Sequence, residues 1–200
     1  MDDTNAVVSA SNTEQLATKV QKVSENIEQY LDDNLLQVNK EKSKLLVNHP
    51  PNQDSSIIII NTSDKPIKPQ QTLKLLGAYI SADLSWNYQV SILMKQLNYR
   101  LNTLKMIAHY CSMKTLKSIA QSIIISKILY TIQLWGGCQQ YLRQRIQSIM
   151  LKAAKLVLGR GAARLSTAQI LHKIGWQGID QTIASHTLRL AVREGFKKKK

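Results

Sequence analysis

The chain has 200 residues, of which 44% are hydrophobic, so its length and composition fit one ordinary globular domain or two small ones. Two cysteines and four histidines without metal-ligand spacing argue against a disulfide framework and a zinc site, and favour a reducing compartment. Residues 1–73 carry a net charge of −3 and residues 74–200 carry +17, giving the total of +14. This asymmetry predicts a polyanionic partner, most commonly nucleic acid, for the second part; the alternative is a basic surface kept for solubility.

The acidic first part is predicted to begin with a strand and a helix. Residues 4–10 suggest a short strand, and the letters SNTE suggest a capping box in which Ser11 is the N-cap and Glu14 reaches back. Apolar residues then recur at steps of three and four from Leu16 to Leu31. This spacing predicts an amphipathic helix that ends near residues 32–34.

Three further stretches of the first part are typical of strands. Residues 34–46 suggest a strand, a polar turn at residues 39–41 and a second strand. Residues 57–60 are four isoleucines, whose β-branching favours a strand. Residues 72–81 predict one more strand, in which Gly77 indicates either a bulge or a place where another backbone comes close.

From Trp86 onward the pattern predicts helices only. Asn87 and Ser112 are predicted N-caps, and Ser166 with Gln169 forms a second capping box. The predicted helices span residues 87–110, 112–134, 141–158, 166–175 and 180–194. The most apolar stretch, residues 119–135, is interrupted by polar residues, so it is predicted to be a buried helix and not a membrane span. Together these patterns predict an α+β protein whose strands precede a helical bundle.

Four segments, in this order, resemble the C-terminal palm and thumb of a reverse transcriptase from a non-LTR (LINE-like) retrotransposon. MDDT is similar to the family's [FY]xDD hairpin without its aromatic residue, and NLLQVNKEKSKLLV is similar to its N-x-L-x-LN-x-x-K-[ST] segment. LKLLGAYISADLSW is similar to K-x-LG-x-x-[IL]-D-x-x-L-x-W, with the aspartate displaced to Asp83. The helical remainder is similar to the family's thumb and the region after it. The matching positions in the two middle segments are Asn34, Leu36, Asn39, Lys42, Ser43, Lys74, Leu76, Gly77, Ile80, Leu84 and Trp86.

The resemblance implies a function in nucleotidyl transfer. It implies that Asp2 and Asp3 hold Mg²⁺, since hard cations prefer carboxylate oxygens, with Asp2 as the direct ligand and Asp3 in support. Lys42 matches a lysine near the leaving pyrophosphate, although a solvated turn lysine is an equal alternative. Leu76 and Gly77 fall in the primer grip, where a backbone approaches the primer's last phosphates; a structural bulge is the alternative for Gly77.

The resemblance also divides the chain. It implies a partial palm of short antiparallel strands and one helix in residues 1–85, thumb-like helices in 86–160, a C-terminal helical extension in 161–196 and a basic tail in 197–200. The thumb is expected to contact the phosphates of an RNA template and DNA primer duplex. The expected contacts are Lys95, Arg100, Lys105, Lys114 and Lys117. Trp86 and Trp135 are expected to be core residues and not base-stacking platforms.

Two parts of the family's machinery have no counterpart in this sequence: an earlier palm aspartate and the fingers. The chain is therefore expected to be a fragment without polymerase activity of its own, with the missing palm and fingers portion as a candidate partner. The alternatives are a non-catalytic nucleic-acid-binding module that uses the basic helical half, and a pseudogene product without a selected role. Acids follow Met1 where a signal peptide would be basic and then apolar, so an intracellular location, in nucleus or cytoplasm and away from membranes, is expected.

Overall fold

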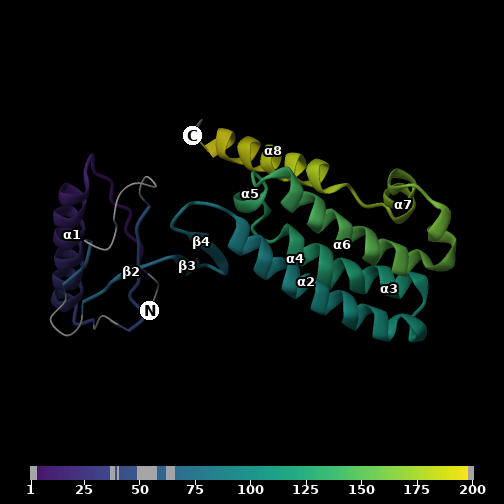
Figure 1. Ribbon diagram of the computed structural model, residues 1–200, viewed down its shortest axis with the longest axis horizontal. Helices are drawn as coiled ribbons and strands as arrows, with labels where there is room; N and C mark the ends of the chain where they lie inside the picture. The colour runs from purple at the N-terminus through teal and green to yellow at the C-terminus, as the bar shows by residue number, and fades with distance from the viewer. Residues whose placement is uncertain (1–3, 37–38, 40, 49–57, 62–65, 198–200) are drawn as a thin grey trace. The chain divides into compact units, whose positions relative to one another are not determined.

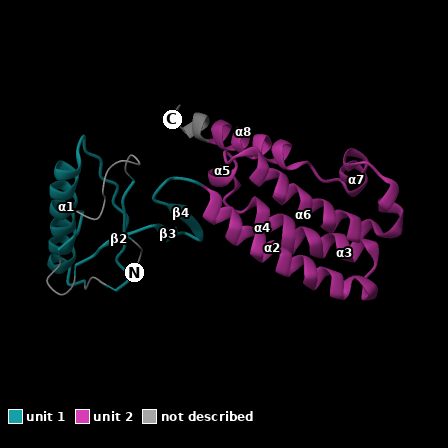
Figure 2. Ribbon diagram, in the orientation of Figure 1, with its two compact units in different colours: residues 1–85 teal, residues 86–200 magenta. Residues whose placement is uncertain are grey.

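The computed structural model shows an α+β protein and describes residues 4–36, 39, 41–48, 58–61 and 66–197 (Figure 1). The chain forms two compact units, Met1–Ser85 and Trp86–Lys200 (Figure 2). The division falls where the sequence changes from strands to helices, but the structure does not separate residues 161–196 from the helices before them. Within the described residues, no helix is long and apolar enough to cross a membrane.

In the first unit, one amphipathic helix precedes two small sheets. Helix α1 spans Thr13–Asp33 and contains no buried residue. Strand β1 (Leu45–Leu46) pairs in parallel with β2 (Pro69–Gln70), and β3 (Thr72–Leu75) pairs antiparallel with β4 (Ala78–Ser81). The parallel pair differs from the antiparallel strands that the resemblance implies. The buried hydrophobic residues among those described are few here: Val47, Ile58 and Ala78.

Several predictions about the start of this unit were wrong. Residues 4–10 form no strand, and the N-cap of α1 is Asn12, whose side chain accepts a hydrogen bond from the Gln15 N–H at 2.8 Å. Ser11, the predicted cap, donates its hydroxyl to the side-chain oxygen of Gln15 at 2.7 Å instead. The end of the helix near residue 33 and the turn before β1 agree with the sequence.

The structure also differs from the two strands predicted at residues 57–60 and 72–81. Ile57 lies outside the described residues, and the three isoleucines after it form only a single bridge, between Ile60 and Ile67. The predicted strand at residues 72–81 is a hairpin, β3 and β4, with Leu76 and Gly77 as its two-residue turn. Residues 35 and 36 are not in a strand, and the rest of that predicted strand falls partly outside the described residues.

The second unit is a helical bundle with its own core. Its elements are α2 (Asn87–Ile107), a 3₁₀ turn (Ala108–Tyr110), α3 (Met113–Ala120), a π-helical turn (Gln121–Ile125), α4 (Ser126–Leu129), α5 (Ile132–Trp135), α6 (Gln140–Leu158), a 3₁₀ segment (Gly159–Arg164), α7 (Thr167–Ile174) and α8 (Ile179–Lys197). Helix α6 contacts α2, α3, α7 and α8, so it lies at the centre of the bundle (Figure 1). The most deeply buried residues include Leu97, Leu104, Trp135 and Ile146, each 0% exposed.

The helix ends follow capping chemistry at several predicted places. Ser112 accepts from the Thr115 N–H at 3.2 Å, and Ser166 with Gln169 forms the full capping box. Asn87 is not a cap, because α2 begins at that residue and Trp86 precedes it without a side-chain bond. The helix predicted through residue 134 is interrupted by the π-helical turn and again at Thr131, which has a positive φ of 59°.

Candidate nucleic-acid interface

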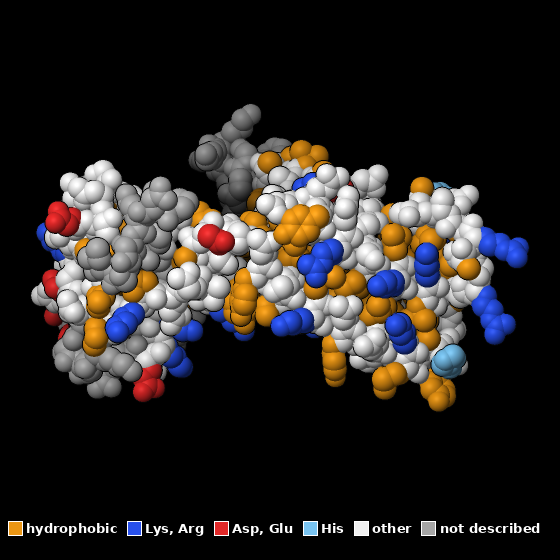
Figure 3. All heavy atoms as spheres, in the orientation of Figure 1, with side chains coloured by type: hydrophobic (Ala, Val, Ile, Leu, Met, Phe, Trp, Pro, Cys, Tyr) orange, Lys and Arg blue, Asp and Glu red, His pale blue; other side chains and the backbone are white. Residues whose placement is uncertain are grey.

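Positive charge is concentrated in the helical unit. Residues 86–200 contain nineteen Lys and Arg against two Asp and Glu, whereas residues 1–85 contain eight against eleven. On the face drawn in Figure 3, Lys and Arg side chains are spread over the region of α2, α3 and α6. Among the described residues the one ion pair joins Arg143 Nε of α6 to Asp180 Oδ1 of α8 at 2.9 Å. No other ion pair joins two described side chains of this unit.

Three of the five expected phosphate contacts are free to meet a ligand. Lys95 and Lys105 are exposed on α2, and Lys114 is exposed in the first turn of α3. None of the three is in an ion pair within the described part of the chain. Their long side chains extend from helices that are anchored by buried leucines on the opposite face. This arrangement suits contacts to a sugar-phosphate backbone, which require charge but no base recognition.

The other two expected contacts, Arg100 and Lys117, are partly buried and have structural partners. Arg100 donates from its Nη1 atom to the carbonyl oxygen of Ile123 at 2.7 Å. Ile123 lies in the π-helical turn, where the regular hydrogen-bond pattern of an α-helix changes. Lys117 Nζ lies 3.7 Å from where a Cβ of Gly175 would be, next to the carbonyl end of α7, where a cation is favourable.

A second basic row, on α6, was missed from the sequence. Arg145, Ser148, Lys152 and Lys155 are all exposed, at steps of three, four and three residues. Residues at these steps share one face of a helix, and the opposite face of α6 is buried. The same spacing is present in the sequence and could have identified the row. Because α6 is held by four other helices, this row is the most firmly supported group of cations in the unit.

The residues assigned to the primer grip form the exposed tip of the β3–β4 hairpin. Leu76 has φ 46° and Gly77 has φ 83°, as a two-residue type I′ turn requires. Gly77 therefore marks a turn, and neither a bulge nor the interior of a strand. Behind the tip, Lys74 Nζ lies 5.8 Å from the ring centre of Tyr79 on the facing strand.

Lys42 is exposed and lies in a turn that Asn39 organises. The Lys42 N–H donates to the Asn39 carbonyl oxygen at 3.1 Å, and the Ser43 hydroxyl donates to the same oxygen at 3.2 Å. The N-x-x-K-S letters thus have a local structural role, because the asparagine forms the turn and the serine closes it. The lysine side chain is left in solvent by this turn.

Acidic residues give no metal centre among the described residues. Asp2 and Asp3 lie outside them, and no group of three His, Cys, Asp or Glu within the described ranges could hold a metal ion. Asp83, the displaced aspartate of the resemblance, accepts from the Ser85 N–H at 2.9 Å, and this hydrogen bond lowers the pKa of the Asp83 carboxyl. Asp83 therefore serves the turn that leads into α2.

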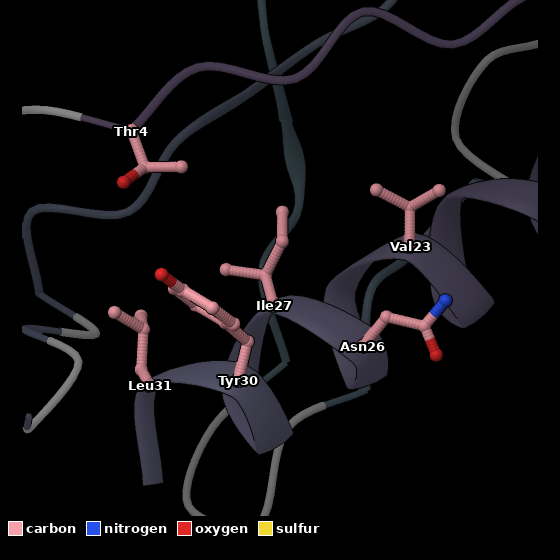
Figure 4. Close-up of a pocket in the computed structure, with 6 residues that line it drawn as sticks. All are labelled: Thr4, Val23, Asn26, Ile27, Tyr30 and Leu31. Carbon is pink, nitrogen blue, oxygen red and sulfur yellow. The ribbon is translucent and has the colours of Figure 1, made fainter. Parts of the chain in front are cut away.

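A small pocket lies on the apolar face of α1 (Figure 4). Its volume is about 210 Å³, and Thr4, Val23, Asn26, Ile27, Tyr30 and Leu31 line it. None of the described residues that line it carries a carboxylate, amine, thiol or imidazole. The pocket lies on a helix that has no buried residue.

Comparisons with protein-family models, with curated proteins and with solved structures gave no match for this chain.

Proposed function

We propose that this chain is the palm and thumb part of an RNA-directed DNA polymerase of the non-LTR retrotransposon type, whose helical unit binds a template–primer duplex through its phosphates. The observation that carries the binding part is the set of exposed, unpaired cations on α2, α3 and α6 over a well-packed core. The polymerase part rests on the ordered sequence resemblance. The nucleus or the cytoplasm is the location proposed with it.

The placement of the cations supports backbone contacts better than base recognition. They extend from helices whose opposite faces are buried, so their positions are fixed while their side chains stay in solvent. A duplex has one charge per ~1.7 Å of its axis, so several cations on neighbouring helices can each neutralise a phosphate. Such binding tolerates any sequence, which a polymerase needs as it moves along its template.

The α6 row provides the sharpest test of duplex binding. We expect the full chain to bind an RNA–DNA hybrid with an affinity that falls steeply with salt, measured by fluorescence anisotropy at several salt concentrations. The triple variant Arg145→Gln, Lys152→Gln, Lys155→Gln should reduce the slope of log K against log salt by about one unit for each cation that touches a phosphate.

A matched control separates the row from net charge. Lys22, Lys44 and Lys68 are exposed in the first unit, and changing all three to glutamine removes the same total charge. This control should leave the salt slope almost unchanged. Equal reductions in both triple variants would show that only the overall charge matters, and would contradict a binding surface on α6.

A non-catalytic nucleic-acid-binding module is the second candidate. What favours it is that the cations and their core belong to residues 86–200, whereas Asp2, Asp3 and Lys42 belong to the other unit. Primer extension with Mg²⁺ or Mn²⁺ distinguishes the two. Synthesis by the chain alone that disappears in Asp2→Ala would assign the acids to catalysis and would contradict the expectation that the fragment is inactive. With the missing palm and fingers portion added, extension would favour the polymerase, whereas its absence with unchanged duplex binding would favour the module.

The described residues include no group of three His, Cys, Asp or Glu that could hold a metal ion. In the proposal, Asp2 and Asp3 hold Mg²⁺ in the intact parent enzyme, where the metal would activate the primer hydroxyl. Lys42, exposed at the Asn39 turn, stays a candidate proton donor to the leaving pyrophosphate. In that intact enzyme, Lys42→Met should lower extension without changing duplex affinity if that role is correct.

A further inference from the structure

The outer face of α2 and the turn after it carry aromatic and methionine side chains that the bundle does not cover. Tyr99 is 76% exposed, Met106 is 72% exposed and Tyr110 is 89% exposed. Hydrophobic side chains project from the edge of the helical unit along α2 in Figure 3. These residues lie opposite the buried leucines of α2, so the helix uses its inner face for the core and leaves this face without a partner.

Lysines border the same surface. Lys95 is four residues before Tyr99 and therefore shares its face of α2. Lys105 precedes Met106 and lies about 100° around the helix axis from it, at the border of the surface, and Lys114 follows Tyr110 in the first turn of α3. All three lysines are exposed, and none is in an ion pair within the described residues. The surface thus alternates positive charge with aromatic rings. We call this set of Lys95, Tyr99, Lys105, Met106, Tyr110 and Lys114 the tyrosine stripe.

We propose that the tyrosine stripe binds a single-stranded nucleic-acid segment, whose bases stack on Tyr99 and Tyr110 while the three lysines contact its phosphates. Aromatic platforms within a positive surface are the usual means of holding a single strand without sequence preference. This inference rests on the proposed function in one respect, namely that the helical unit binds nucleic acid. It goes further because it assigns an unpaired strand to a surface separate from the α6 row, and it gives Lys95, Lys105 and Lys114 to that strand in place of the duplex.

The dimensions of the stripe suit a short strand. Tyr99 and Tyr110 are eleven residues apart, eight in α2 and three in the 3₁₀ turn, which corresponds to about 18 Å along the axis. A strand stacked at about 3.4 Å per nucleotide covers this length with about five nucleotides. The two rings can therefore hold bases at either end of such a segment.

A second copy of this chain fits the stripe less well. Residues 86–200 carry nineteen Lys and Arg against two acidic residues, so two such surfaces repel each other. Tyr99 and Tyr110 are 76% and 89% exposed, so both rings are accessible to a ligand. A polyanion with flat aromatic bases complements both properties of the surface.

The test uses the full chain, a labelled pyrimidine strand of about 12 nucleotides and a duplex of the same length. The double variant Tyr99→Ala, Tyr110→Ala should weaken single-strand binding by about fivefold or more for each ring removed, with the salt slope unchanged because no charge is altered. Duplex binding should change little. Tyr99→Phe, Tyr110→Phe keeps both rings and should bind the strand as the unchanged chain does.

Leu188→Ala is the matched control, since Leu188 is 65% exposed on a different helix, α8. It should not alter single-strand binding. Single-strand affinity that survives the double alanine variant would overturn the inference while duplex binding through α6 still stands. An unchanged chain that binds neither ligand would instead refute the proposed function. A dimer in solution that the alanine variant converts to a monomer would show that the stripe is a protein interface, and would also overturn the inference.

Discussion

Gly136 lies where the end of α5 packs against α8, and an added methyl group there should destabilise the helical unit. Gly136 is buried, and a Cβ at this position would lie 2.5 Å from the carbonyl oxygen of Ile132 and 2.9 Å from Cγ2 of Ile183. Its φ of −60° suits any residue, so the obstacle is space and not backbone strain. Overpacking of this kind costs about 1–3 kcal/mol.

The effect should appear in thermal unfolding followed by the helical circular dichroism signal. For a unit of this size, Gly136→Ala should lower Tm by roughly 4–12 °C. Gly137→Ala is a matched control, because a Cβ on Gly137 meets nothing within 4 Å. That variant should keep or slightly raise Tm, since alanine restricts the unfolded chain.

A double-mutant cycle identifies the contact responsible. Ile183→Ala removes the side-chain part of the obstruction, so Gly136→Ala should cost less in that background than alone. The carbonyl of Ile132 remains, so the relief should be partial. Equal Tm values for Gly136→Ala and Gly137→Ala would refute the packing of α5 against α8 described above.

Three further predictions concern residues outside that contact. Arg100→Met should lower the free energy of unfolding by about 1–3 kcal/mol, because the Ile123 carbonyl oxygen loses its donor. If urea unfolding is unchanged and the salt slope of duplex binding falls, Arg100 contacts a phosphate instead. Leu76→Asn should stabilise the β3–β4 hairpin by up to about 1 kcal/mol, because asparagine tolerates φ 46° better than leucine. Hydrogen exchange of the hairpin amides should then become slower, and an unchanged exchange rate would contradict the prediction. Burial raises the pKa of the Cys138 thiol above its ordinary 9.0, against the opposing charge of Arg143, so alkylation at neutral pH should be slower at Cys138 than at the half-buried Cys111. Above about pH 9 the unfolded thiol loses its proton while the folded Cys138 thiol keeps it, so the free energy of unfolding should fall as the pH rises through this range. Alkylation of Cys138 that is faster than that of Cys111 would refute the burial of Cys138.

Local chemistry made part of the helical unit predictable. The Ser166–Gln169 capping box and the Ser112 cap each depend on residues within one turn of the helix start, so the sequence contains all that determines them. The same holds for the ends of α6 and α7 at Gly159 and Gly175, both with φ 71°. The buried face of α6 followed from its helical periodicity.

The interruption of the helix predicted at residues 112–134 is explained by the spacing of its buried residues. Leu116, Ala120, Ile124, Ile128 and Ile132 are all buried, at strict steps of four residues. In a straight α-helix each such step turns the side chain about 40° beyond a full turn, or roughly 160° over the whole series. A single helix could not bury all five, so the π-helical turn and the break at Thr131 correct the drift.

The hairpin and the candidate site depend on contacts that sequence patterns do not record. Leu is an unusual first residue for a type I′ turn, which is why Leu76 and Gly77 resembled the middle of a strand. Arg100 lies three residues after the buried Leu97 and four before the buried Leu104, so its spacing already places it beside the core face of α2. Its charge was the reason to expect it in solvent, whereas its partner is the carbonyl oxygen of Ile123, 23 residues later. The leucine spacing of α2 places Tyr99 and Met106 away from the core, but the spacing does not show whether another helix covers them.

The π-helical turn at Gln121–Ile125 also bears on how the chain tolerates changes in length. It contains about one residue more than a regular helical turn of the same rise. Deleting one residue from it would restore ordinary winding and leave α4 and α5 facing the core as before, whereas a deletion within α6 would rotate half of that helix out of register. The bundle can therefore accommodate a deletion of one residue at the π-helical turn, whereas deletions elsewhere in its helices would disturb the packing.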